Sequence, residues 1–210
     1  MRALPALAMA LALAAGTSQA RRPDVRARVY TSPSDIVAVE LAFNRLAREK
    51  GQWTAFRETA ADDAVMFVPE KVLAKDWLKK RADPPAPVQW QPRRVYVSCN
   101  GRTAASTGAW QRPDGSRGYF TTIWQLNDKG EWKWALDHGD SLAKPLAETE
   151  ALRGYTATCR KADRSGSGVP QDSSLLWTYD VREDGSRLLR VETWNGSAYD
   201  IVIDDKVMAP

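Results

Sequence analysis

His138 is the only histidine of this 210-residue chain, and it lies at the end of an apolar run between two carboxylates. An imidazole has an ordinary pKa of about 6.5, so it is the side chain best suited to move a proton near neutral pH. Side chains alternate between the two faces of a strand, which places Asp140 with His138 and Asp137 on the opposite face. The sequence predicts His138 and Asp140 as the candidate catalytic pair. The alternative is a packed histidine with no part in chemistry.

Aromatic residues are the second group with chemical meaning, and nine of them are tryptophans. By the same alternation, Trp134 shares a face with His138, and Phe120 and Trp124 form the matching face of the preceding run. We expect these rings to line a pocket for a flat apolar molecule. The predicted ligand-binding residues are Trp53, Phe56, Trp77, Tyr96, Trp110, Phe120, Trp124, Trp134 and His138. The alternative is that most of the rings fill the core of a curled sheet.

Other kinds of chemistry have little support in the sequence. One histidine and two cysteines without close spacing are too few for a zinc site, so no metal is expected. The chain has no serine nucleophile elbow, no Walker loop and no dinucleotide fingerprint, and no cofactor is expected.

The N-terminus predicts export. Arg2 precedes an apolar run from Ala3 to Ala15, and small residues end at Ala20, which is the layout of a signal peptide cleaved after that residue. The mature protein is therefore expected in the periplasm or outside the cell, with no membrane association after cleavage. Cys99 and Cys159 form an even pair in such an oxidising compartment, which predicts a disulfide; two separate buried thiols are the alternative.

Charge gives no sign of a nucleic-acid partner. The formal net charge is +4 and the basic residues are spread along the chain. The densest basic cluster is Lys71, Lys75, Lys79, Lys80 and Arg81. Apolar residues at helical spacing interrupt this cluster, so it is interpreted as the solvated face of a helix from Glu70 to about Arg81.

The order of elements follows from the periodicity of apolar residues. Helical spacing predicts helices from about Ser34 to Lys50 and from Gln52 to Ala61, and Ala64–Pro69 is a short strand. After a proline-rich loop, four strands follow in an antiparallel meander: 90–99, 103–111, 118–126 and 131–138. A helix-prone segment at 143–152 and a flexible loop at 164–172 lead to three more strands: 174–181, 187–194 and 197–203.

This arrangement resembles the NTF2-like superfamily, and within it the secreted SnoaL-like or DUF4440-type domains. The resemblance is carried by Gly51-Gln52-Trp53, by AASTGAW at Ala104–Trp110 and by IWQLNDKGEWKWALDHG from Ile123. It covers about Ser34 to Leu142 and implies an α+β cone, in which three N-terminal helices pack in a strongly curved antiparallel sheet. It also implies a homodimer and a pocket at the open end. The expected divisions are a signal peptide (1–20), a mobile N-terminal arm (21–33), the cone (34–142), a linker (143–173) and a three-strand C-terminal extension (174–210).

The resemblance leaves three functions open. The first is an exported module that binds a small apolar or aromatic molecule in the cone. The second is an enzyme of the isomerase, cyclase or hydrolase kind, in which His138 and an interior carboxylate act as acid and base. The inward-reaching carboxylates expected for it are Glu40, Glu58, Asp62, Asp63 and Asp140, with Tyr96 and Tyr119 as donors. The third is a structural dimerisation module with a filled cone.

Overall fold

A computed structural model describes residues 31–147, 151–160 and 172–209. The predicted signal peptide and residues 21–30 of the predicted arm lie outside the described residues, as does most of the loop expected at 164–172. Within the described part, no helix combines the length and the apolar character that a membrane crossing requires.

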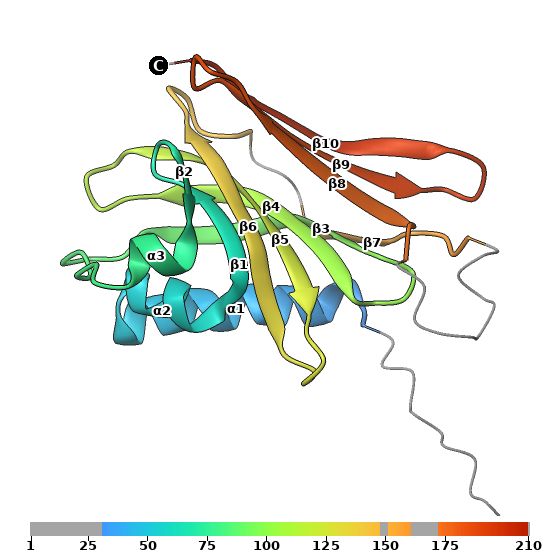
Figure 1. The fold of residues 1–210 in the computed structure, drawn as a ribbon, viewed down its shortest axis with the longest axis horizontal. Coiled ribbons are helices and arrows are strands. Elements are labelled where there is room, and N and C mark those ends of the chain that lie inside the picture. Colours follow the sequence, from blue (N-terminus) through green and yellow to red (C-terminus); the bar gives the residue numbers. More distant parts are fainter. Residues whose placement is uncertain (1–30, 148–150, 161–171, 210) are drawn as a thin grey trace, which may run out of the picture.

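The described chain forms three helices and ten strands in three layers (Figure 1). The elements are α1 (Pro33–Lys50), α2 (Gln52–Thr59), β1 (Ala60–Phe67), β2 (Lys71–Leu73), α3 (Ala74–Leu78), β3 (Gln89–Val97), β4 (Thr103–Gln111), β5 (Arg117–Leu126), β6 (Trp132–Ser141), β7 (Arg153–Thr156), β8 (Leu175–Val181), β9 (Arg187–Trp194) and β10 (Tyr199–Val207). A seven-stranded sheet has the order β2-β1-β6-β5-β4-β3-β7, and a separate sheet has the order β10-β9-β8. The expected α+β class with a small C-terminal meander is confirmed.

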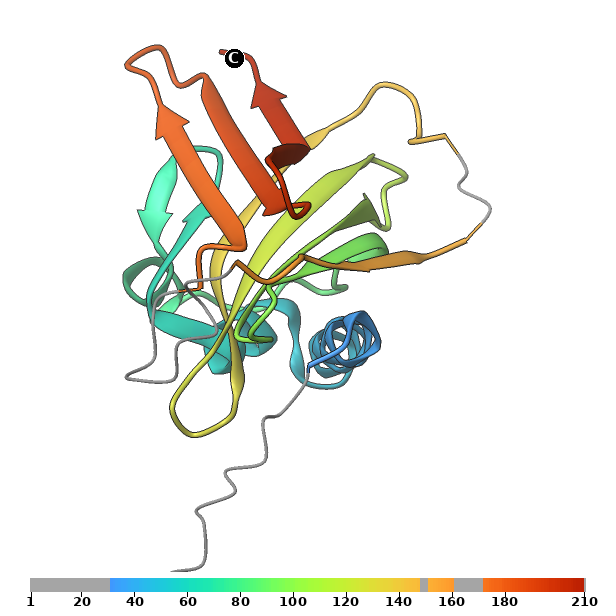
Figure 2. The same cartoon turned by 90° about the vertical axis from the view of Figure 1, so that its right-hand side faces the viewer.

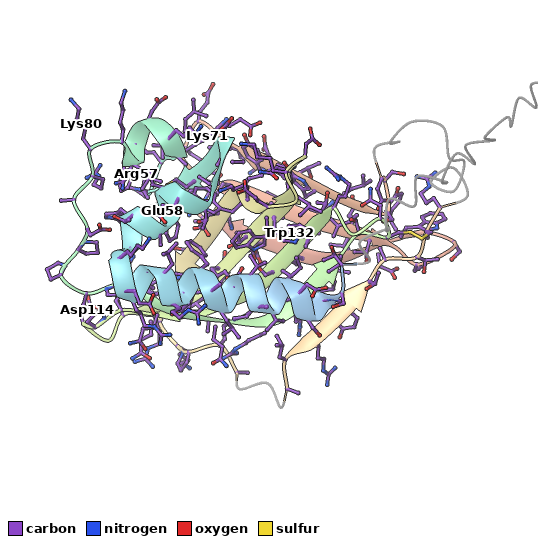
Figure 3. The ribbon with its side chains drawn as sticks, turned by 90° about the horizontal axis from the view of Figure 1, so that it is seen from below. Arg57, Glu58, Lys71, Lys80, Asp114 and Trp132 are labelled. Carbon is purple, nitrogen blue, oxygen red and sulfur yellow. A yellow bond between two sulfur atoms is a disulfide. The ribbon has the colours of Figure 1, made fainter. Side chains whose placement is uncertain are left out.

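Helix α1 is defined by its ends and by one apolar face. The Asp35 carboxylate accepts a 2.7 Å hydrogen bond from the Ser32 backbone N–H, which fixes the first turn. Gly51 ends the helix with a φ of 107°, a conformation that favours glycine. Ile36, Phe43 and Ala47 on one face are buried against the sheet. Figure 3, seen from below, shows α1 lying across the strands.

The sheet is mixed rather than wholly antiparallel. Strands β3 to β6 form the expected antiparallel meander, but β1 pairs parallel to β6 and β7 pairs parallel to β3. One predicted helix is largely wrong. In place of a helix from Glu70 to Arg81, the chain forms β2 and the short α3, because β1 offers an edge to which Lys71–Leu73 pairs. Tertiary pairing overrides local helix propensity in this segment. In the segment predicted as helix-prone, 143–147 and 151–152 are not helical and 148–150 lie outside the described residues; Arg153–Thr156, directly after it, pairs with the edge of β3.

The C-terminal sheet covers the face of the large sheet that is turned away from α1 (Figure 2). Tyr96, Ala105, Ile123 and Leu136 on that face form one buried cluster with Leu175, Leu189, Val191 and Ile203. A three-stranded sheet is too small to bury a core of its own, and this packing gives it one. The predicted disulfide is present: Cys99, after β3, joins Cys159, after β7, with their Cα atoms 5.0 Å apart.

Candidate functional site

Strand β6 contains a bulge that decides which side chains enter the cone. Trp134 lies opposite Trp124 on β5, and Leu136 lies opposite Ile123. Ala135 therefore has no partner of its own, which is the geometry of a β-bulge. Beyond Ala135, every side chain of β6 lies on the face opposite to the one that simple alternation predicts.

The two sides of this bulge have different surroundings. Trp124 and Trp134 are fully buried in the cluster formed with the helices, as predicted. Leu136 instead packs with the C-terminal sheet. Asp137 consequently points into the cone, where Thr122 donates a hydrogen bond to it. The prediction that His138 shares the inner face with Trp134 is wrong.

His138 is sealed beneath the C-terminal sheet. Its side chain has no exposed surface, and its ring lies edge-on to Phe67 with the ring centroids 5.4 Å apart. Nδ1 is 3.8 Å from Asp205 Oδ2 on β10, and neither ring nitrogen has a hydrogen-bond partner among the described residues. Asp140, its predicted partner, is also on the outer side and lies opposite Tyr119. No hydrogen bond joins His138 to Asp140 within the described residues, and their role as an acid and base pair stays a prediction.

The open end of the cone contains a cavity of about 510 Å³. Most of the predicted ligand-binding residues belong to its lining: Trp53, Phe56, Trp77, Trp110, Phe120 and His138, the last with a fully buried side chain; Asp140 lines it as well. Trp124 and Trp134 are absent from the lining and belong to the buried core. Tyr96 is on the other face of the sheet, stacked on Tyr155 with centroids 5.2 Å apart. Helical spacing and alternation identified many of the rings, but they missed Phe43, Met66 and Asp137.

Asp137 is the carboxylate of the cavity lining that lies on the inner face of β6. Its Oδ2 accepts a 2.9 Å hydrogen bond from the Thr122 hydroxyl on the neighbouring strand. Burial raises the pKa of Asp137 to about 7; the hydrogen bond from Thr122 opposes the rise and the nearby charge of Glu40 adds to it. The side chain can be reached from the cavity but is otherwise enclosed by protein. It can therefore hold or release a proton near neutral pH.

Glu40 forms a second polar centre on helix α1, deeper in the cone. Oε1 accepts a 2.8 Å hydrogen bond from Trp124 Nε1, and Oε2 accepts one of 3.0 Å from Trp90 Nε1. The Ser106 hydroxyl is a third donor. Burial raises the pKa of Glu40, and these three donors oppose the rise. Glu40 thus reaches inward as predicted, and it holds two tryptophans in place.

The remaining predicted donors and acceptors lie elsewhere. Glu58, Asp62 and Asp63 are exposed, and Asp62 pairs with Lys75. Burial raises the pKa of Tyr119, which lies at the lip of the cavity. The basic cluster is exposed on both sides of α3, and Figure 3 shows Lys80 projecting away from the body. Within residues 31–147, 151–160 and 172–209, no three histidine, cysteine or carboxylate side chains gather as a metal site.

One signal in the sequence could have revealed Asp137. Trp134, Ala135 and Leu136 are three consecutive apolar residues, which breaks the alternation of a half-buried strand. Such a break indicates a bulge, and a bulge moves the next polar residue to the other face.

Comparisons with known proteins give remote likenesses only. No protein-family model matches the chain, and no curated protein matches it significantly. Among solved structures, an NTF2-like protein of unknown function from Methylobacillus flagellatus is 17% identical and covers 55% of this chain and 98% of its own, with a TM-score of 0.42. A provisionally assigned ketosteroid isomerase from Parabacteroides distasonis is 17% identical over 51% of this chain and 89% of its own, with a TM-score of 0.43. An NTF2-like superfamily protein from Salmonella enterica is 14% identical over 53% and 94%, with a TM-score of 0.38. None of them assigns an activity to this chain.

Proposed function

We propose that the cavity at the open end of the cone binds a small, flat, mainly apolar molecule that presents one hydrogen-bonding group to Asp137. The main support for this proposal is a cavity of about 510 Å³ that is lined by aromatic rings. It contains the Asp137 carboxylate, which is hydrogen-bonded to Thr122. That volume lies within the range of small-molecule sites, and such sites combine apolar walls with few polar groups. A purely structural module would have no need of this hollow.

The aromatic walls favour a planar ligand. Trp53 and Trp77 meet edge to face with centroids 5.1 Å apart, and Phe43 and Trp90 do so at 4.8 Å. Edge-to-face packing holds each ring at a fixed angle and leaves ring surface available to a guest. Trp90 is further fixed by its hydrogen bond to Glu40, so this part of the wall is preorganised.

Indole N–H signals in a proton–nitrogen NMR spectrum test this proposal, with p-cresol as the probe. We expect the signals of Trp53, Trp77, Trp90 and Trp110 to shift on titration, while those of Trp177 and Trp194 in the C-terminal sheet stay unchanged. Val88→Trp, which fills part of the cavity, should weaken binding, whereas Val181→Trp on the exposed C-terminal sheet should not. Uniform small shifts of all indole signals, unaffected by Val88→Trp, would overturn the proposal.

A second function, proton transfer catalysis of the isomerase or cyclase kind, is favoured by the pKa of Asp137. With a pKa of about 7, this carboxylate can take a proton from carbon next to a carbonyl group and return it. The interior base is then Asp137 and not His138. The test is incubation of 2-tetralone in D₂O with native protein and with Asp137→Asn, followed by NMR. Faster deuterium incorporation with native protein than with Asp137→Asn would support catalysis. Binding of the ketone without deuterium incorporation would contradict catalysis and support binding as the function.

We also infer export and a homodimer from the sequence pattern of residues 1–20 and from the NTF2-like resemblance. N-terminal sequencing of protein from the native host should begin at Arg21, and light scattering should give twice the chain mass. An unprocessed N-terminus or a monomer would contradict the respective inference.

A further inference from the structure

We propose that Arg187 binds the carboxylate of the ligand at the mouth of the cavity, so that the ligand class is an aromatic carboxylate. This inference rests on the proposed binding function and adds the charged group that the ligand must carry. It gives the C-terminal extension a part in recognition, because Arg187 is the first residue of β9.

Arg187 is held across the mouth by the main body of the protein. One terminal nitrogen donates a 2.8 Å hydrogen bond to the Gly139 carbonyl of β6, and the other donates one of 3.4 Å to the Pro69 carbonyl after β1. The guanidinium also lies over the Phe67 ring, 4.8 Å from its centroid. These contacts fix the group where β1 and β6 separate, and there it lines the cavity.

Arg187 forms no direct ion pair within the described part of the chain, and the charge of Asp140 acts on it only from beyond ion-pair distance. Its Nε is buried without a hydrogen-bond partner among residues 31–147, 151–160 and 172–209. An arginine has five N–H donors, and the structure gives hydrogen bonds for two of its nitrogens, to carbonyls of described residues. Burial lowers the pKa of Arg187, and the charge of Asp140 opposes this without a direct contact. A carboxylate bound directly to the guanidinium would reduce the cost of burying this cation.

Other charges at the mouth favour one anionic group over several. Arg112 also lines the cavity and stacks on Trp110, 4.5 Å from its ring centroid. Asp140 lines the same region and opposes a second anion. Asp137 lies further along the lining, where a neutral ring and not a charge is expected, because two carboxylates in close contact repel each other. The arrangement fits a ring among the tryptophans with its carboxylate directed at Arg187.

The test compares two probes of equal shape, 4-methylbenzoate and 4-methylbenzamide, by calorimetric titration at pH 6. At this pH Asp137 keeps most of its proton and does not repel the benzoate. We expect native protein to bind the benzoate about tenfold or more tightly than the amide, as a charged hydrogen bond to arginine provides. Arg187→Met should abolish this preference while changing amide affinity less than about twofold. Arg190→Met, on the same strand and paired with Asp204 outside the cavity, is the matched control and should change neither affinity.

The outcomes separate the two proposals. If both probes bind equally to native protein, the carboxylate inference fails and the binding function stands. If neither binds, the binding function fails and the inference with it. If Arg187→Met does not fold, the arginine Nε–H signal of native protein decides: a shift with benzoate but not with amide supports the inference, and equal shifts overturn it. Asp140→Asn should strengthen benzoate binding alone, because it removes the opposing charge.

Discussion

The Thr122 hydroxyl donates a 2.9 Å hydrogen bond to Oδ2 of Asp137, directly across strands β5 and β6. The two residues face each other inside the cone because Ala135 is bulged out of the pairing. Without this bulge, His138 would occupy the inner face and Asp137 would lie under the C-terminal sheet. One unpaired residue thus selects the ionisable group that faces the cavity.

Asp137→Asn should stabilise the protein at high pH. The pKa of this carboxyl rises from 3.8 to about 7 on folding, so the unfolded chain loses the proton first as pH rises. Stability of the native sequence therefore falls between about pH 4 and pH 7 and is lowest above the folded pKa. The full shift corresponds to at most about 4 kcal/mol, and because the cavity admits water to this group we expect about 2 kcal/mol. Urea unfolding of both proteins at pH 4 and pH 8 measures the difference, which should appear only at pH 8. A variant that is equally destabilised at both pH values would contradict the expectation.

Trp134→Ala should cost about 3–5 kcal/mol of unfolding free energy, because it leaves a cavity in the core. Trp134 is fully buried, and its Nε1 donates hydrogen bonds of 3.1 Å to Phe56 O and to Thr59 Oγ1. Trp132→Ala, two residues earlier, should cost clearly less, because that half-buried ring lies in a groove beside α1 (Figure 3). Chemical denaturation compares the pair. Equal losses would contradict the deeper burial of Trp134 relative to Trp132.

Replacing Cys99 and Cys159 together by serine should lower stability by up to about 4 kcal/mol, since the bridge closes a loop between residues 60 apart. Reduction of the native protein should have the same effect and should leave the double variant unchanged. Titration of unfolded, unreduced protein measures free thiols directly. Two free thiols in that experiment would show that Cys99 and Cys159 are not bridged.

Leu189→Ala should destabilise the protein by about 2–5 kcal/mol, because Leu189 is fully buried between the two sheets. Leu176→Ala is the control: this leucine is 36% exposed on a neighbouring strand, and its loss should cost less than about 1 kcal/mol. Thermal unfolding followed by circular dichroism compares them. Similar losses for the two variants would mean that the C-terminal sheet does not cover the cone as described.

Local sequence patterns predicted most of the fold. The helical spacing of Ile36, Phe43 and Ala47 locates α1, and strand β4 has its predicted bounds, Thr103–Gln111. Local sequence patterns do not predict a strand that forms only by pairing with the edge of a distant strand. Strands β2 and β7 form only because β1 and β3 present free edges, which no local pattern records.

The candidate site was predicted less well than the fold, for a related reason. Trp53 and Trp110 line the cavity as predicted, and their aromatic character was enough to identify them as lining residues. The acid was missed because a one-residue bulge at Ala135 reverses the orientation of all later side chains in β6. Arg187 was missed because it comes from a different sheet, 48 residues after the Gly139 carbonyl to which it bonds.

Carbon-13 NMR of the carboxyl groups measures the central feature, an Asp137 side chain that faces the cavity and titrates near neutrality. Comparison with Asp137→Asn assigns the signal, and titration in the absence of ligand gives its midpoint. The structure predicts a midpoint at about pH 7. A midpoint near the ordinary value of 3.8 would place this carboxylate in solvent and contradict the site as described.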